Sequence, residues 1–252
     1  MRLFPHQLRG EQRLYWRSRE LAFFTFLFPI ILLLLLGSVY GDDVIKKEHG
    51  VKATSYLVAG ILGYGVAATA FAGLAIVLVL RRESGVLKRV RGTPLPPATY
   101  LAAVIASTTI VYLIEAVALV LLGRLAYGVP LPNQWFSLFI AILLGALSFA
   151  ALGIALTGAI RSGDGASAVV NAIYLPLAFL AGAFWSAQNF PHVIKDISNV
   201  LPLTHFIRLM RNIVVLHETI WSNLDQVAII AAWGLGGLVL AILFFRWEPR
   251  ES

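Results

Sequence analysis

Long apolar runs are the feature that most limits the folds open to this sequence of 252 residues. A bilayer core about 30 Å thick is crossed by roughly 20 apolar residues in a helix, because only a closed hydrogen-bond ladder is tolerated there. Six stretches meet this requirement, and they cover residues 21–40, 56–80, 100–122, 135–160, 166–184 and 226–245. The runs predict an all-α membrane protein with six transmembrane helices.

Composition agrees with this interpretation and excludes several kinds of site. The chain is 59% hydrophobic and 13% charged, whereas soluble chains are about 45–50% apolar and about 25% charged. The net charge of +7 does not indicate nucleic acid, because the basic residues lie between the apolar runs, where they would meet membrane lipids. The absence of cysteine excludes disulfides, Cys-ligated zinc and thiol nucleophiles. The five histidines form no spaced pair, so no metal site is predicted.

The distribution of Lys and Arg predicts how the chain is oriented. More of them lie on the side that holds the N-terminal tail, the segment 81–97 and the C-terminal tail. Under the positive-inside rule both termini are therefore expected in the cytoplasm. About twenty polar residues precede the first apolar run, which favours a retained helix over a cleaved signal peptide. We expect one transmembrane domain over 1–252, with an interfacial helix over 1–20, a membrane region over 21–245 and a cytoplasmic tail over 246–252.

The N-terminal tail has two different faces when it is drawn as a helix. Arg9, Arg13 and Arg17 recur every four residues and share one face. Apolar and aromatic residues fall on the opposite face, namely Phe4, Leu8 and Tyr15, and Trp16 lies on the flank. This pattern predicts an interfacial helix on the inner leaflet. Glu11 falls among the apolar positions and weakens the pattern, and a solvated basic tail that only enforces topology is the alternative.

The segment 81–97 reads as a short amphipathic helix between the second and third runs. Val86, Leu87 and Val90 offer an apolar patch among basic residues, and Gly92 and Pro94 end the helix. A rigid element fixed between two membrane helices suits the transmission of a push from a cytoplasmic partner. Composition alone does not separate this reading from a plain basic loop.

The stretch 185–225, before the last run, is too apolar for an ordinary soluble loop. Two short helices broken at Pro191 and Pro202, dipping into the outer leaflet, would hide its apolar residues. Irregular backbone at that depth is tolerated only against protein or a wet cavity. A pair of surface helices is the alternative.

Few polar side chains lie inside the runs. Glu115 is the clearest ionisable one, and such a group is costly unless it is paired or faces water. It has either a proton or cation role or a structural pairing with Arg124 or Arg208. Four residues of the fifth run are candidates to line a path: Asn171, Tyr174, Phe179 and Phe184. For Asn171, an interhelical hydrogen bond is the alternative.

Motifs for catalysis are absent from the sequence. It contains no Gly-x-x-x-x-Gly-Lys-[Ser/Thr] loop, nucleophile elbow, zinc motif or clustered carboxylate pair. We therefore predict no catalytic residues and no cofactor bound by this chain. Any ATP-driven process would need a separate ATPase.

The segment 81–97 resembles the Glu-x-x-x-Gly-x-Leu-x-x-Leu-(Arg)-x-(Thr)-Pro-Leu segment of ABC-2 permeases, the membrane subunits of bacterial type V ABC exporters. The residues that occupy the pattern are Glu83, Gly85, Leu87, Lys88, Arg89, Val90, Arg91, Thr93, Pro94 and Leu95, although the spacing from Glu83 to Gly85 is shorter than in the family. The resemblance implies a coupling helix that docks on the ATPase. It assigns ATPase coupling to Arg82, Glu83, Gly85, Leu87, Lys88, Arg89, Val90, Arg91 and Pro94.

The resemblance extends over essentially the whole chain and implies further properties. The stretch before the last helix would be a re-entrant hairpin at an extracellular gate, involving Phe190, Pro191, Pro202, Thr204 and Arg208. Two permeases, identical or related, would pair with two cytoplasmic ATPases that bind ATP and Mg²⁺. The location implied is the bacterial inner membrane. Family substrates range from hydrophobic drugs to lipids and lipid-linked glycans, and the apolar, aromatic spans favour an amphiphile.

Two other functions are alternatives to an exporter permease. A secondary carrier coupled through Glu115 predicts broken helices in two corresponding halves, which the sequence does not display. A membrane-embedded transferase needs clustered acidic or histidine residues at the cytoplasmic face, where the acids are widely spread.

Overall fold

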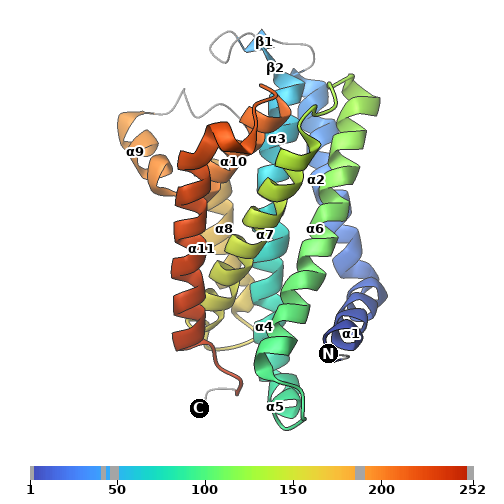
Figure 1. The fold of residues 1–252 in the computed structure, drawn as a ribbon, viewed down its shortest axis with the longest axis vertical. Coiled ribbons are helices and arrows are strands. Elements are labelled where there is room, and N and C mark those ends of the chain that lie inside the picture. Colours follow the sequence, from blue (N-terminus) through green and yellow to red (C-terminus); the bar gives the residue numbers. More distant parts are fainter. Residues whose placement is uncertain (1–2, 41–43, 46–50, 185–190, 249–252) are drawn as a thin grey trace.

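The computed structural model describes residues 3–40, 44–45, 51–184 and 191–248. Long helices run side by side from one end of the molecule to the other (Figure 1). Within the described residues the only strands are β1 (Val44–Ile45) and β2 (Val51–Lys52), a short antiparallel pair. The predicted helical fold is therefore confirmed, with this short strand pair as an addition.

Five helices are long and apolar enough to cross a membrane. Their bounds are Arg19–Tyr40 (α2), Ala53–Glu83, Pro97–Tyr127 (α6), Trp135–Thr157 (α7) and Ile220–Phe244. The second joins α3 (Ala53–Val66), η1 (Ala67–Gly73) and α4 (Leu74–Glu83), and the last joins η3 (Ile220–Asn223) and α11 (Leu224–Phe244). All five coincide with predicted runs and extend a few residues beyond most of them.

The fifth predicted run forms a shorter helix than its apolar length suggested. Helix α8 covers Ala166–Leu180, whereas the apolar run continues to residue 184. Gly182 adopts a left-handed conformation with φ 72°, and its N–H donates to the carbonyl of Phe179 at 3.1 Å. This turn ends the helix in the manner of a C-terminal glycine cap. An apolar run therefore marked the segment but not its end.

The second long helix contains a wide turn in its middle. Residues Ala67–Gly73 form a π-helix between α3 and α4, which is rare and is often found at functional sites. This long helix is the most enclosed of the five, with 78% of its apolar window buried. The wide turn therefore lies in the interior of the bundle, where it contacts α6, α7 and α8.

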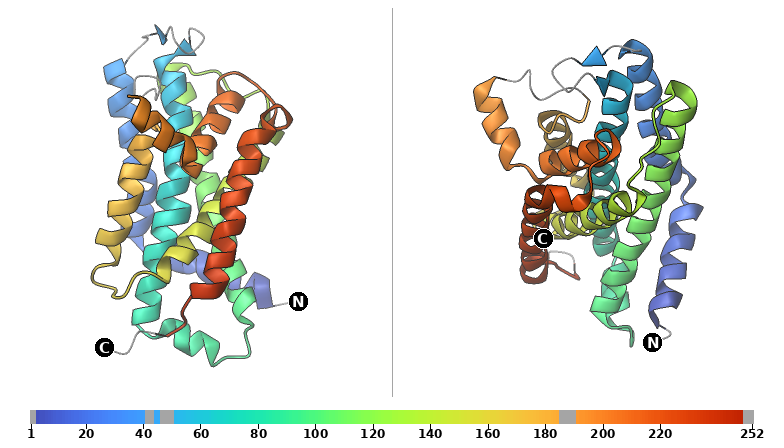
Figure 2. Two further views of the ribbon diagram at one scale, coloured as in Figure 1. Left: turned by 90° about the vertical axis from the view of Figure 1, so that its left-hand side faces the viewer. Right: turned by 45° about the horizontal axis from the view of Figure 1, so that its top comes forward.

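The two ends of the molecule carry different short elements. Both described chain ends, α1 (Leu3–Arg17) and α5 (Val86–Arg91) lie at one end (Figures 1 and 2). The strand pair, α9 (His192–Val200) and α10 (Pro202–Val214) lie at the other. The short elements therefore frame the long helices from opposite sides.

Small residues on α7 let neighbouring elements approach closely. A side chain at Gly153 would meet the backbone oxygen of Phe71 at 2.7 Å, and one at Gly145 would overlap the ring of Phe206. Such contacts are typical of helix packing in membranes, where backbones approach through small residues. They bring the π-helix and α10 against α7.

Candidate functional site: the coupling end and the membrane pocket

The segment predicted to couple to a partner forms a separate short helix. Helix α4 ends at Glu83, and Gly85 takes a left-handed conformation with φ 71° before α5 begins at Val86. A residue with a β-carbon would be strained at that position. Gly85 thus sets the direction in which α5 leaves the end of the bundle.

One apolar side chain anchors α5 to the long helices. Leu87 is 0% exposed and packs in a cluster with Leu78 and Tyr100, and Val90 and Leu95 pack against the same cluster. The basic face, which we define as Lys88, Arg89 and Arg91, is exposed, and so is Pro94. The predicted amphipathic helix is therefore confirmed, with one side anchored and the basic side free to meet another molecule.

Arg82 lies in the same basic run but has a different environment. Its side chain is buried, and its guanidinium donates to the carbonyls of Thr157 at 2.9 Å and Ile160 at 2.7 Å. It also pairs with the half-buried Glu83 carboxylate at 3.1 Å. Thr157 is the last residue of α7 and Ile160 follows it closely, so Arg82 fastens α4 to the end of α7. Within the predicted coupling set, Arg82 therefore acts inside the chain and not at its surface.

Helix α1 docks on the bundle through polar contacts. The carboxylate of Glu11 pairs with Arg81 at 2.8 Å, and Arg81 donates to the hydroxyl of Tyr100 at 2.8 Å. Gln12 donates to the carbonyl and the hydroxyl of Ser107 on α6, both at 3.0 Å. Glu11, which interrupted the predicted apolar face, is thus the residue that ties α1 to α4. The face of α1 that carries Glu11 and Gln12 therefore contacts protein.

The other predicted residues of α1 lie as the helical pattern indicated. Arg9, Arg13 and Arg17 are exposed, and Tyr15 is half-buried. Burial raises the pKa of Tyr15 to about 12. Trp16 is exposed and stacks on Phe26 of α2 at 5.7 Å between ring centroids. The arginines therefore form the outward face of a helix whose inner face rests on the bundle.

Glu115 lies in the interior, beside the π-helix. It is 1% exposed, and one of its carboxylate oxygens accepts a hydrogen bond from the Thr69 hydroxyl at 2.8 Å. The other oxygen points at Gly65, where a side chain would meet it at 2.6 Å. Among the described residues no ion pair joins Glu115 to Arg124 or Arg208, so the predicted pairing is wrong. Arg208 donates instead to the side chain of Asn199.

Three of the candidate path residues meet at an aromatic cluster. The hydroxyls of Tyr64 and Tyr174 lie 3.2 Å apart, and the rings of Tyr64 and Phe179 each lie 5.4 Å from that of Phe184. Tyr64, on α3, was missed in the sequence because it looks like any other apolar residue of its run. Asn171 is exposed on another part of α8. This cluster joins α3 and α8 across the bundle.

The predicted pair of short helices is confirmed near the other end of the molecule. Pro191 precedes α9 and Pro202 is the first residue of α10. The hydroxyls of Ser198 and Thr204 lie 3.1 Å apart, and the His205 ring is 2.8 Å from the carbonyl of Asn199. Phe190, also predicted for this site, lies outside the described residues. Local hydrogen bonds thus hold the two helices at a fixed corner.

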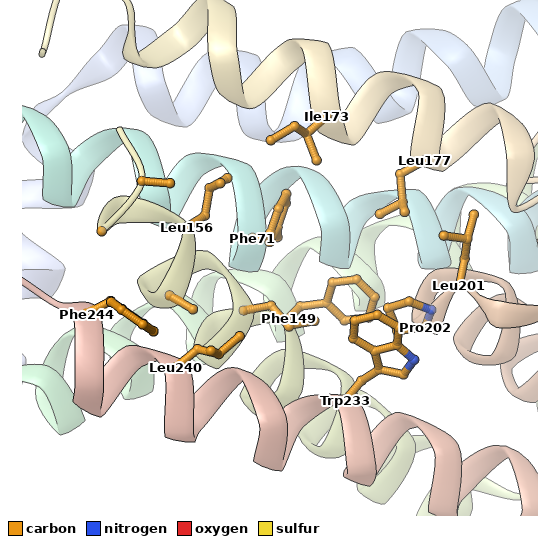
Figure 3. Close-up of a pocket in the computed structure, with 14 residues that line it drawn as sticks. Phe71, Phe149, Leu156, Ile173, Leu177, Leu201, Pro202, Trp233, Leu240 and Phe244 are labelled. Atoms are coloured by element: carbon orange, nitrogen blue, oxygen red, sulfur yellow. The ribbon is translucent and has the colours of Figure 1, made fainter. Parts of the chain in front are cut away.

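An apolar pocket of about 420 Å³ runs along the bundle between α7, α8 and α11. Figure 3 shows Ile173 and Leu177 of α8 on one side and Trp233 of α11 on the other, with Phe71 and Phe149 between them. Leu201 and Pro202 line its end beside α10. The Trp233 indole N–H donates a hydrogen bond to the carbonyl of Val200 at 3.2 Å. The pocket therefore offers apolar surface and no charged group.

Comparisons with known proteins give a consistent result. The family model described as ABC-2 type transporter matches residues 4–215. The putative transport permease YvfS of Bacillus subtilis is 26% identical over 207 residues, which cover 82% of this chain and 83% of that protein. The inner membrane transport permease YhhJ of Escherichia coli is 28% identical over 173 residues, covering 67% of this chain but only 46% of that protein. Nodulation protein J of Rhizobium leguminosarum is 34% identical over 91 residues, 35% of each chain.

Proposed function

Because this chain belongs to the ABC-2 type transporter family, we propose that it moves a hydrophobic or amphiphilic substrate outward across the bacterial inner membrane. It is a permease subunit, and permeases of this family work with ATPase subunits. In the proposed complex two permeases, identical or related, pair with cytoplasmic ATPases that bind ATP and Mg²⁺. The substrate classes proposed are a drug, a lipid or a lipid-linked glycan.

The observation that carries this proposal is the two-sided environment of α5. Its basic face is exposed at the end of the molecule, while Leu87 is fully buried against the long helices. An exposed basic face steers and orients an acidic partner surface, and a buried anchor makes the helix move together with what it packs on. Helix α5 is therefore suited to receive force from an ATPase.

Three sets of contacts would pass that force into the bundle. Leu87 presses on the cluster that contains Tyr100 of α6. Arg81 links the end of α4 to Glu11 of α1. Arg82 links it to the carbonyl of Thr157, the last residue of α7, and to that of Ile160 just after the helix. A displacement of α5 would thus act on α1, α6 and α7 together, which supports a joint role for α1 and α5 in coupling.

The proposed membrane arrangement places α1, α5 and both termini in the cytoplasm. Helix α8 is the sixth crossing, with its short length extended by the turn at Gly182. The corner between α9 and α10 forms the extracellular gate, and the apolar pocket that it borders gives a hydrophobic substrate a favourable environment. Asn171 on the exposed face of α8 would face the path between two permeases.

Charge reversal on the basic face tests the proposal. In the complex reconstituted with its ATPase, Lys88→Glu combined with Arg89→Glu should lower ATP-dependent movement of a fluorescent phospholipid about tenfold, because like charges across the interface cost more than 1.4 kcal/mol. Arg124→Glu, an exposed arginine near the other end of α6, is the matched control and should retain transport.

Two results would count against it. Transport that persists in the double variant would remove α5 from the coupling path. Transport by the permease without any ATPase would favour a secondary carrier, in which case Glu115→Gln should abolish it.

A further inference from the structure

We propose that a second groove, on the outer side of α6, α7 and α11, holds one acyl chain of an anionic phospholipid from the cytoplasmic leaflet, with its phosphate at Arg246. The lipid stays bound as a structural partner and is not cargo. The proposal rests on the proposed function only for the orientation of the chain in the membrane.

The groove is large, apolar and separate from the pocket in Figure 3. Its volume is about 800 Å³, within the range of roughly 300–1,000 Å³ typical of ligand sites. It shares no lining residue with the pocket between α7, α8 and α11. Small side chains open its surface, among them Ala102 of α6, Ala151 of α7 and Ala231 of α11. Such a surface fits a flexible hydrocarbon chain.

The length of the groove matches one leaflet. Along α7 its lining extends from Leu144 to Ile154, which is about 15 Å at 1.5 Å per residue. Along α11 it extends from Ala231 to Ile242, about 17 Å by the same rule. Half of a bilayer core of about 30 Å is similar. The groove therefore accommodates a chain that enters from one side only.

The mouth of the groove has the chemistry of an anionic interface. Arg246 is exposed and lies between Phe245 and Trp247, which both line the groove. The first turn of α6, at Pro97, lines the same mouth and contributes the positive end of a long helix dipole. Basic residues beside aromatic ones favour anionic lipids at the cytoplasmic surface. Glu248 is also exposed nearby, so the charge test changes Arg246 alone.

The wall of the groove contacts the cluster of Leu87 and Tyr100 on which α5 is anchored. Trp247 packs on Phe245 at 5.2 Å and on Tyr100 at 6.0 Å between ring centroids. Tyr100 accepts the hydrogen bond from Arg81 and packs in the same cluster as Leu87. A chain lying against Phe245 and Trp247 would support the side chains on which α5 rests. Lipid bound here would therefore stabilise the docking of the coupling helix.

Lipid binding to the purified full chain tests the proposal. Native mass spectrometry would compare phosphatidylglycerol with phosphatidylcholine of identical acyl chains. The wild-type chain should prefer phosphatidylglycerol, and Arg246→Gln should lower that preference about fivefold, as expected from about 1 kcal/mol per basic residue at an anionic surface. Arg124→Gln, at the other end of α6, should leave the preference unchanged.

Filling the groove tests the site of the acyl chain. Ala102→Trp should lower the binding of both lipids, whereas Ile114→Trp, an exposed residue of the same helix outside the groove, should not. If Ala102→Trp fails to fold, Ala98→Trp at the exposed mouth replaces it.

Four results would overturn the proposal. They are equal binding of the two lipids by the wild-type chain, unchanged binding when the groove is filled, dissociation of a permease dimer by Ala102→Trp, and release of the bound lipid during ATP hydrolysis. The third would assign the groove to the contact between two copies, and the fourth would make the lipid cargo. Because the first three results are measured without an ATPase, a failure to transport would leave them intact.

Discussion

The helices α5 and α10 are both short, and each begins next to a residue that interrupts helical structure, but they are packed in different ways. Helix α10 is almost entirely buried, with Leu203, Phe206 and Ile207 all at 0% exposure. Helix α5 buries only Leu87. Around α5 the contacts are charged, such as Arg81 with Glu11, whereas around α10 they include neutral pairs such as Ser198 with Thr204.

This difference supports the proposal that α5 transmits motion while α10 stays fixed. Helix α10 is packed on several long helices, so moving it would disturb much of the bundle. Helix α5 has one fully buried apolar anchor and a free basic face. Polar contacts connect α4, the helix that precedes α5, to α1 and α7. We therefore expect apolar substitutions to matter most around α10 and polar ones to matter most beside α5.

The largest effect on stability is expected at Phe206. This ring is buried against Phe149 at 6.1 Å between centroids, and Phe206→Ala would leave a cavity beside Gly145. The free energy of unfolding in detergent should fall by about 3–5 kcal/mol. Phe136→Ala, which removes a ring that is 69% exposed on α7, is the control and should change it little. Equal losses would show that α10 is not a packed element.

A smaller but clear effect is expected at Arg82. Replacement by Met keeps an unbranched apolar stem but removes the guanidinium and its hydrogen bonds to Thr157 and Ile160. The free energy of unfolding should fall by about 2–3 kcal/mol, because the lost bonds involve a charged group and leave buried carbonyls unpaired. Arg89→Met should have almost no effect on stability, since Arg89 is exposed. If thermal unfolding of the two variants is the same, Arg82 does not fasten α4 to α7.

The smallest effect is expected at the corner between α9 and α10. Thr204→Val keeps the shape of the side chain but removes the contact with Ser198, and the free energy of unfolding should fall by about 1 kcal/mol. Thr219→Val, at an exposed hydroxyl pair with Ser222, should cost less. A loss at Thr204 larger than that at Arg82 would reverse the proposed contrast between the two ends.

The sequence predicted the parts of this fold that depend on local chemistry. Apolar runs located five long helices, and prolines located the breaks before α9 and α10. Spacing of four residues located the arginine face of α1, and Gly92 and Pro94 located the C-terminal end of α5. In each case the signal lies within the segment that it describes.

The remaining features depend on contacts between distant residues. Arg82 resembles its basic neighbours in the sequence, and only its approach to α7 makes it a buried link. Thr69 lies in the π-helix and contacts Glu115 on another helix. No residue pattern predicted that wide turn. Tyr64 belongs to the aromatic cluster because the fold places α3 beside α8. Apolar composition likewise could not reveal that Gly182 stops α8.

The wide turn at Ala67–Gly73 also sets the angular position of everything after it. An α-helix turns about 100° per residue, and a π turn accommodates about one residue more than an α turn. Restoring an α-helix there while keeping all of its residues would rotate α4 by about 100° relative to α3. Arg81 would then leave Glu11, and Arg82 would leave α7. The wide turn in the interior thus determines which neighbours the arginines at the end of the same helix can bind.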